Sequence, residues 1–175
     1  MYFHPFPTIK YDPTGSGYTT EIKDIMTRVA VKKWVRDKAA AFSKYGVPNG
    51  ATPDQVAFFL YDDTEYHWIV MLMNDITDRY HDWPLTTPQF LSFLKEKYSN
   101  PNATHHYEIT QTSGDTTVKI NVGTVNTDYP SATAVTNFEY EEAEQNKKRQ
   151  IRLLDPGYVD LVTDDLKRLM KESII

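Results

Sequence analysis

The 175-residue chain contains no cysteine. This absence excludes disulfides, thiolate zinc sites and cysteine nucleophiles, and it suits a reducing compartment such as a bacterial cytoplasm. The chain also lacks a glycine-rich phosphate loop, a nucleophile elbow and a His-Glu-x-x-His stretch, so the strongest motifs of hydrolases and nucleotide enzymes are missing. No apolar run is long enough to span a membrane, and Met1–Pro7 lacks the basic start and apolar core of a signal peptide. We therefore expect a soluble protein that is not exported by the general route.

Positive charge is also scarce, because the formal net charge is −5. Phosphate binding needs a concentrated basic face, and this chain has only two short basic clusters. They are Lys32-Lys33 with Arg36, and Lys147-Lys148-Arg149 with Arg152. We interpret both as solvated faces and predict no binding of nucleic acid.

The composition is that of a globular protein, with 40% hydrophobic and 13% aromatic residues. Its clearest pattern is in residues 50–75, which predict two short helices separated by the acidic turn Tyr61-Asp62-Asp63. Thr52 is the predicted N-cap of the first helix, Pro53 its first residue and Gln55 the partner that completes a capping box. Two apolar stripes are expected to bury these helices: Val56, Ala57, Phe59 and Leu60 in the first, and Trp68, Ile69 and Leu72 in the second.

Other elements follow from periodicity and turn chemistry. Residues 1–20 read as an extended arm, whose apolar residues lie either on the parent domain or on a neighbour. Between Ile22 and Val47 the earlier half favours strand, whereas Lys38–Phe42 favours helix. The cap-then-proline sequence Thr87-Pro88 opens a third helix with Phe90, Leu91, Leu94 and Tyr98 on one face. Later elements are a β-hairpin at 106–110 and 117–122, a loop at 123–136, a short acidic helix at 138–146, a strand at 149–154, and a last helix carrying Val159, Val162, Leu166, Leu169 and Met170.

These patterns resemble a known family. Thr-Pro-x-x-Val-Ala from Thr52, Leu-Tyr-Asp-Asp from Leu60, and Tyr-His-Trp-x-x-x-Leu-x-Asn-Asp from Tyr66 resemble the helical part of a LysM-type module. With Tyr80–Thr86, Lys148–Leu154 and the helix from Tyr158 to about Ser173, their order is similar to the gene 53 baseplate wedge subunits of T-even-like contractile-tailed phages. The similarity covers about the last two thirds of the chain and is loose before Ala40.

The resemblance implies an α+β fold: a LysM-like core of strand, two short helices and closing strand, with an inserted helix and β-hairpin. The expected segments are an extended arm at 1–20, the helical core with its leading strand and third helix at 21–98, the hairpin insertion and loop at 99–137, and a short helix, closing strand and C-terminal helix at 138–175. LysM modules hold N-acetylglucosamine polymers, and the insertion departs from their compact pattern in a way that could cover that face.

Three kinds of cluster have residue types that occur in chemical sites. His105-His106 with Glu108 has the residue types of a zinc or iron site, but adjacent strand residues point to opposite faces, so only one histidine could join Glu108. His81-Asp82 could be an oriented base, although no nucleophile is evident nearby. The paired acids Asp62-Asp63, Asp164-Asp165 and Glu139–Glu144 lie where turns or exposed helical faces place acids anyway. We predict no catalytic residue, metal or cofactor.

The function implied by the resemblance is structural. The chain would be a wedge subunit in the virion tail baseplate, assembled in the host cytoplasm, present in multiple copies in a six-fold assembly, and joining wedges into a ring around the hub without contacting membrane. The alternative is a LysM-type module that binds peptidoglycan. Candidate partner contacts are Tyr2, Phe3, Phe6, Ile9, Tyr158, Leu169 and Met170, and the structural signature is Thr52, Gln55, Trp68 and Asn74.

Overall fold

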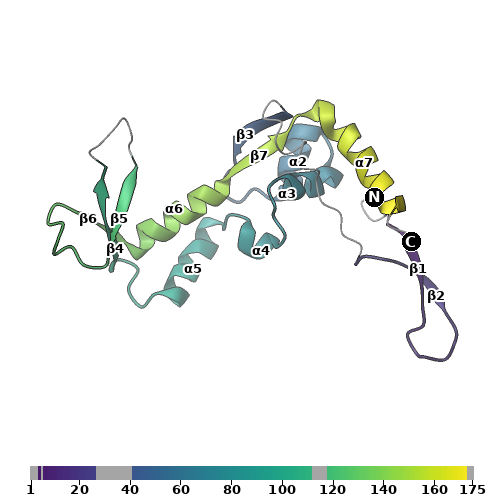
Figure 1. Ribbon diagram of the computed structural model, residues 1–175, viewed down its shortest axis with the longest axis horizontal. Coiled ribbons are helices and arrows are strands. Elements are labelled where there is room, and N and C mark those ends of the chain that lie inside the picture. The colour runs from purple at the N-terminus through teal and green to yellow at the C-terminus, as the bar shows by residue number, and fades with distance from the viewer. Residues whose placement is uncertain (1–3, 5, 27–40, 112–117, 173–175) are drawn as a thin grey trace. The chain divides into compact units, whose positions relative to one another are not determined.

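The computed structural model describes residues 4, 6–26, 41–111 and 118–172. Over these residues the protein is mixed α+β, as predicted, with short sheets and helices (Figure 1). The chain forms two compact units: the first contains Met1–Val47, Ala51–Arg79 and Ile151–Ile175, and the second contains Pro48–Gly50 and Tyr80–Gln150. This grouping differs from the predicted segments, because the third helix shares a unit with the hairpin rather than with the helix pair.

The centre of the first unit runs from strand to helix pair to strand. Strand β3 (Phe42–Gly46) pairs with β7 (Gln150–Leu154), and helices α2 (Pro53–Tyr61) and α3 (His67–Met73) lie between them in sequence, joined by the short 3₁₀ helix η2 (Thr64–Tyr66). The capping box at the start of α2 is confirmed, with the backbone N–H of Thr52 donating to the Gln55 side chain at 3.1 Å. The turn after α2 is closed by Asp62, which takes a left-handed conformation with φ of 56°.

The buried stripes of the two helices differ from the predicted ones by small rotations. On α2 the buried residues are Pro53, Val56 and Ala57, whereas Phe59 is 75% exposed. Spacings of three and four residues from Pro53 place Val56 and Ala57 on the inner face and leave Phe59 off it. On α3 the buried residues are Ile69, Val70 and Met73, one residue later than predicted. Trp68 is partly buried and packs against both hydrophobic clusters of this unit.

Asn74 and Tyr61 connect the helix pair to the closing strand. The Asn74 amide donates to the carbonyls of Val70 and Arg152, and its oxygen accepts from the Arg152 N–H, all at 2.8 Å. The Tyr61 hydroxyl donates to the Leu154 carbonyl at 3.0 Å, and burial raises the pKa of Tyr61 to about 12. Both side chains therefore hold the strand β7 against the helices.

Helix α7 (Val159–Glu172) follows the 3₁₀ turn η3 (Pro156–Tyr158), which Asp155 caps through Gly157 N–H. Its buried residues are Val159, Leu166 and Met170, with Val162 and Leu169 half-buried, so the predicted apolar face is confirmed. Phe6 is only 6% exposed and packs with Leu166 and Met170.

The region of the predicted N-terminal arm is more structured than the sequence indicates. Strands β1 (Thr8–Tyr11) and β2 (Thr20–Lys23) pair as an antiparallel hairpin instead of remaining extended without a partner. The Lys23 ammonium donates to the carbonyls of His4 and Phe6, at 3.0 and 2.8 Å, which ties the hairpin to the buried Phe6. Strand β3 begins at Phe42, where helix was favoured; the rest of the ambiguous region, 27–40, lies outside the described residues.

Helix α4 (Arg79–Asp82) belongs to the second unit from Tyr80 onward. The second unit also contains helices α5 (Thr87–Lys97) and α6 (Asn137–Arg149) and the sheet β5-β4-β6. Its strands are β4 (Thr104–Thr110), β5 (Lys119–Gly123) and β6 (Thr133–Thr136), all antiparallel to their neighbours. The hairpin β4–β5 was predicted, but β6 lies in the stretch that was predicted as loop. The cap of α5 is Thr86, one residue before the predicted position, and Leu91 is 45% exposed rather than buried. Phe90 of α5 packs on Phe138 of α6, with ring centroids 5.6 Å apart.

Candidate interaction surfaces

The hairpin β1–β2 presents an uncovered apolar face. Ile9 and Ile22 are direct cross-strand partners, and Tyr11 follows on the same face because strand side chains alternate. All eight strand residues are exposed. A two-stranded hairpin is at best marginally stable on its own in water, and here it has no cover from the described residues. The apolar side chains of Ile9, Tyr11 and Ile22, called the hairpin face below, are therefore available to a partner.

The tip of this hairpin is held by Asp12. Its carboxylate accepts from the N–H groups of Gly17 at 2.7 Å and Thr14 at 3.0 Å. The hydrogen bond from Gly17 is the main reason that the pKa of Asp12 lies below its usual value. The loop between β1 and β2 is thus closed by local bonds to Asp12.

Helix α2 exposes two neighbouring phenylalanines. Phe58 is 58% exposed and Phe59 is 75% exposed, and the Phe59 ring lies 6.4 Å from that of Tyr45 on β3. Large aromatic side chains of this kind dominate the energy of many protein interfaces. The sequence prediction missed this surface because it counted Phe59 in the buried stripe. A strict three-and-four-residue periodicity from Pro53 would have left both residues outside.

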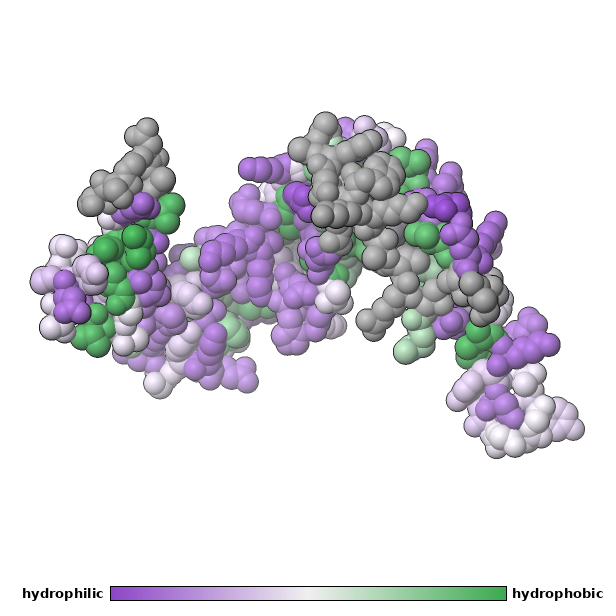
Figure 2. Space-filling model, viewed as in Figure 1, coloured by the Kyte–Doolittle hydropathy of each residue, from purple (hydrophilic) through white to green (hydrophobic). Residues whose placement is uncertain are grey.

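The sheet of the second unit also exposes apolar side chains. Val118 and Ile120 are 57% and 44% exposed, and Val125 and Tyr129 in the following loop are exposed as well. Figure 2 shows green apolar residues gathered over this sheet. An exposed edge strand with apolar side chains is a place where another chain can add.

The predicted contact residues divide into three groups. Phe6 and Met170 are buried in the first unit, so the prediction that they contact partners is corrected: each fills its own chain's core. Ile9 is 42% exposed, Tyr158 is 38% exposed and Leu169 is half-buried. Tyr2 and Phe3 lie outside the described residues.

The histidine cluster is arranged differently from the prediction. His105 and His106 meet, with their Nδ1 atoms 2.8 Å apart, although adjacent strand residues normally point to opposite faces. The register of β4 against β6 shifts between Thr104 and His106, and this irregularity turns the two rings together. His106 Nε2 lies 3.1 Å from the Glu108 carboxylate, and the His105 ring stacks on Tyr140 at 4.0 Å. Among the described residues no group of three or more acids and histidines is arranged to hold a metal.

A buried carboxylate organises the junction of α5 and α6. Glu141 is 5% exposed, and its Oε1 accepts from Lys97 Nζ and the Tyr98 hydroxyl, both at 2.7 Å. Burial alone raises the pKa of Glu141, but the hydrogen bonds from Lys97 and Tyr98 outweigh it and hold the pKa below its usual value. The same bond to Glu141 raises the pKa of Lys97. Glu141 is therefore a structural anion rather than a proton donor at neutral pH.

Several of the other acids and bases named in the sequence analysis also have structural partners. Asp63 caps η2 through the Glu65 N–H, Glu139 caps α6 with Thr136, and Glu144 pairs with Lys147. In the basic cluster, Lys148 donates to the His81 carbonyl and Arg149 to the Leu85 carbonyl. Arg152 lies over the Phe42 ring at 5.1 Å. None of the described helices has the length and apolar content required to cross a bilayer.

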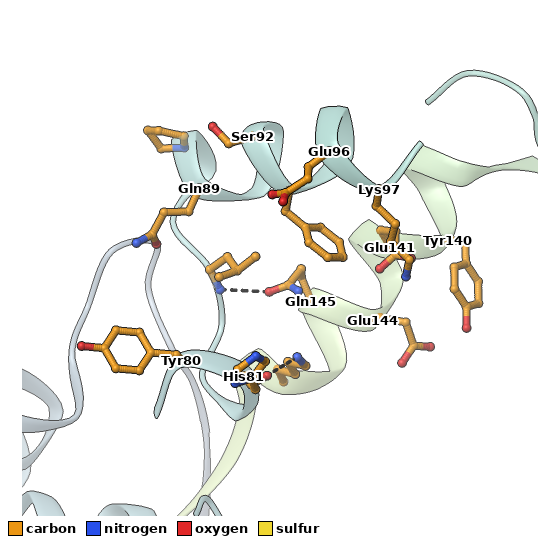
Figure 3. Close-up of a pocket in the computed structure, with 14 residues that line it drawn as sticks. Tyr80, His81, Gln89, Ser92, Glu96, Lys97, Tyr140, Glu141, Glu144 and Gln145 are labelled. Carbon is orange, nitrogen blue, oxygen red and sulfur yellow. Dashed lines mark hydrogen bonds and ion pairs between the residues drawn. The ribbon is translucent and has the colours of Figure 1, made fainter. Parts of the chain in front are cut away.

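One groove of about 770 Å³ lies in the second unit, between α5 and α6 with Tyr80 and His81 of α4 at one end (Figure 3). From α6 it is lined by Tyr140, Glu141, Glu144, Gln145 and Lys148. From α5 and the segment before it, the lining residues are Leu85, Pro88, Gln89, Ser92, Phe93, Glu96 and Lys97. Its volume lies in the range of sites that hold a small ligand, although the groove is open to solvent.

Two comparisons with known proteins both find baseplate wedge proteins. A family model described as "Base plate wedge protein 53" matches residues 1–111, which is more than half of the chain. "Baseplate wedge protein gp53" of Enterobacteria phage T4 is 22% identical over 144 residues, which cover 74% of this chain and 74% of that protein.

Proposed function

Because this chain belongs to the family of base plate wedge protein 53 and is a structural protein of the bacteriophage tail baseplate, we propose that it is a wedge subunit that binds other wedge proteins and helps join wedges into the ring around the hub. The observation that carries the proposal is the exposed hairpin face, which the matched region contains. In this proposal the subunit is present in multiple copies in a six-fold assembly, reaches the virion from the host cytoplasm, and contacts neither nucleic acid nor membrane.

We further propose that β3, α2, α3 and β7 form a LysM-like core. The order strand, helix, helix, strand supports this, as does the pairing of β3 with β7 across a long stretch of sequence. Asn74 at the end of α3 then locks the closing strand to the helix pair. The second unit is the insertion in this scheme.

The contacts are proposed to lie on the hairpin face, on Phe58 and Phe59, and on the exposed parts of Tyr158 and Leu169. Phe6 and Met170 support the hairpin from the core instead of binding a partner. Catalysis plays no part in this proposal, since the acids and histidines described above are engaged in caps, ion pairs and ring contacts.

The double variant Ile9→Thr/Ile22→Thr tests the proposal, because threonine keeps strand propensity while removing apolar surface. We expect a folded protein with normal thermal stability that enters wedges or closes them into rings poorly, measured by sedimentation of reconstituted baseplate proteins. The control is Lys10→Thr on the opposite face of the same hairpin. Assembly of the double variant at the control level would refute the role of this face.

The LysM-like arrangement also favours a second candidate, binding of peptidoglycan. Pull-down with purified peptidoglycan separates the two: retention of the chain by glycan, together with unimpaired assembly of the double variant, would favour the second candidate.

A further inference from the structure

The turn between β3 and α2 contains the only Asn-Gly pair in the chain, Asn49-Gly50. Both residues are exposed, and Gly50 has a positive φ of 83°, a conformation that glycine adopts without strain. The space beside its Cα is open, since a Cβ built there would meet no atom within 4 Å. Asn49 and Gly50 therefore lie in an uncrowded turn that solvent reaches.

The backbone nitrogen of Gly50 is available as a nucleophile. In the deamidation of an asparagine, the backbone nitrogen of the following residue attacks the side-chain amide carbon, Cγ. The Gly50 N–H makes no hydrogen bond within the described part of the chain, so the fold does not engage this nitrogen. Glycine also carries no side chain that would crowd the attack.

The amide of Asn49 is polarised by the start of α5, which belongs to the same unit. Its Oδ1 accepts from the Thr87 N–H at 3.1 Å. Thr87 is the first residue of α5, where the N–H groups have no partner within the helix and form the positive end of its dipole. A donor at this oxygen stabilises the negative charge that the oxygen acquires when Cγ is attacked. The bond thus holds the oxygen, which stays on Cγ, and not the amide nitrogen, which departs.

We propose that Asn49 is a site of spontaneous deamidation, in which the Thr87 N–H assists attack by the Gly50 nitrogen. The new bond from this nitrogen to Cγ closes a succinimide ring. The bond from Cγ to Nδ2 breaks, and Nδ2 leaves as ammonia with the proton that the Gly50 nitrogen gives up. Water then opens the ring at either carbonyl and yields aspartate or isoaspartate. The reaction needs no partner protein, so it is independent of the proposed function.

The two products change the turn in different ways. Aspartate places a carboxylate against the Thr87 N–H, at the end of α5 where negative charge is favourable. Isoaspartate instead directs the main chain through the former side chain, which adds one carbon to the backbone between β3 and α2 and moves the carboxylate. Deamidation therefore alters the charge of this turn in both products and its length in one.

Mass spectrometry of the full chain tests the site. Wild-type protein is incubated at mildly alkaline pH, where the Gly50 nitrogen loses its proton more readily, and is then digested. We expect the fragment that contains Asn49 to gain the mass difference between an amide and an acid, and to separate into aspartate and isoaspartate forms, before any other asparagine changes. Asn49→Gln should stay unmodified over the same time, because its longer side chain must close a larger ring.

Two variants at Thr87 test the role of the donor. Thr87→Pro removes the N–H, and proline is tolerated at the first position of a helix. Thr87→Ala is the matched control, because it changes the same exposed side chain and keeps the N–H. We expect deamidation about fivefold slower in Thr87→Pro, the ratio for one net hydrogen bond, and at the wild-type rate in Thr87→Ala. Circular dichroism shows whether each variant is folded.

A blocked peptide of residues 45–54 provides a second measurement, since it has the same Asn-Gly pair without Thr87. Faster deamidation in the folded chain than in the peptide supports the inference, and it decides the matter if Thr87→Pro does not fold. Asn49 that stays intact in the folded chain while the peptide converts would overturn the inference. Equal rates in Thr87→Pro and Thr87→Ala would overturn it as well.

Discussion

Replacement of Asn74 by alanine tests how the closing strand is held. The side chain makes three hydrogen bonds, one to the Val70 carbonyl within α3 and two to the backbone of Arg152 in β7. Arg152 is exposed, so water can replace its two bonds, and each is worth about 0.5 kcal/mol net. The bond to Val70, a residue that is 1% exposed, is worth about 1 kcal/mol. The expected loss of unfolding free energy for Asn74→Ala is therefore about 2 kcal/mol.

A second variant, Asn74→Asp, distinguishes the loss of the hydrogen bonds of Asn74 from a general effect of shortening the side chain. Aspartate keeps the acceptor for the Arg152 N–H but places a carboxylate against the carbonyls of Val70 and Arg152, where two donated bonds stood. Because the repulsion adds to the lost bonds, we expect Asn74→Asp to be less stable than Asn74→Ala. The control is Asn102→Ala at an exposed asparagine of the second unit, expected within about 0.5 kcal/mol of wild type.

Urea denaturation and amide hydrogen exchange measure the two effects. For a chain of this size a loss of 2 kcal/mol lowers the urea midpoint by roughly 1 M. The Arg152 amide should exchange faster in Asn74→Ala, which removes its acceptor, while amides of α5 in the second unit keep their rates. An unchanged midpoint with an unchanged Arg152 rate, or an aspartate variant more stable than alanine, would refute the bridging role of Asn74.

Three further predictions concern the core and the helix caps. The folded state lowers the pKa of Glu141, so ionised Glu141 stabilises the fold at pH values above its unfolded pKa of about 4.3, and this stabilisation is lost as the pH falls through the folded pKa. Glu141→Gln should therefore reduce the loss of thermal stability at acidic pH, measured by thermal melts across pH. Phe6→Ala should lower the unfolding free energy by about 3 kcal/mol in chemical denaturation, since the ring is buried against α7, and wild-type stability would show that the hairpin docks independently of it. Thr52→Ala should lose about 1 kcal/mol in urea denaturation, as should Thr136→Ala at the equivalent cap of α6, and an unchanged midpoint would mean that the hydroxyl contributes nothing.

The longer helices and the strands β4, β5 and β7 could be predicted because their determinants are local. Thr52 with Gln55, the prolines near the starts of α2 and α5, and the spacing of Val159, Leu166 and Met170 act within a few residues, so they can be read along the chain. The same local order carried the resemblance that the family match supports. For Asn74 the sequence predicts a bond to the turn that follows it, whereas the structure shows bonds to Val70 and to the distant Arg152.

The tertiary structure determines the contacts between residues that are distant in the sequence. Strand β6 has weak local strand signals and forms because it pairs with β4. Phe6 is buried because Leu166 and Met170 of α7, far along the chain, pack against it. His105 and His106 meet only through the irregular pairing of β4 with β6. Glu141 reads as one acid among several on α6, and only its burial beside Lys97 and Tyr98 distinguishes it from Glu142 on the exposed face. Local propensity favours a backbone conformation within a few residues. Burial and hydrogen-bond partners depend instead on which distant segment packs against a residue, and the order of residues along one chain does not show this.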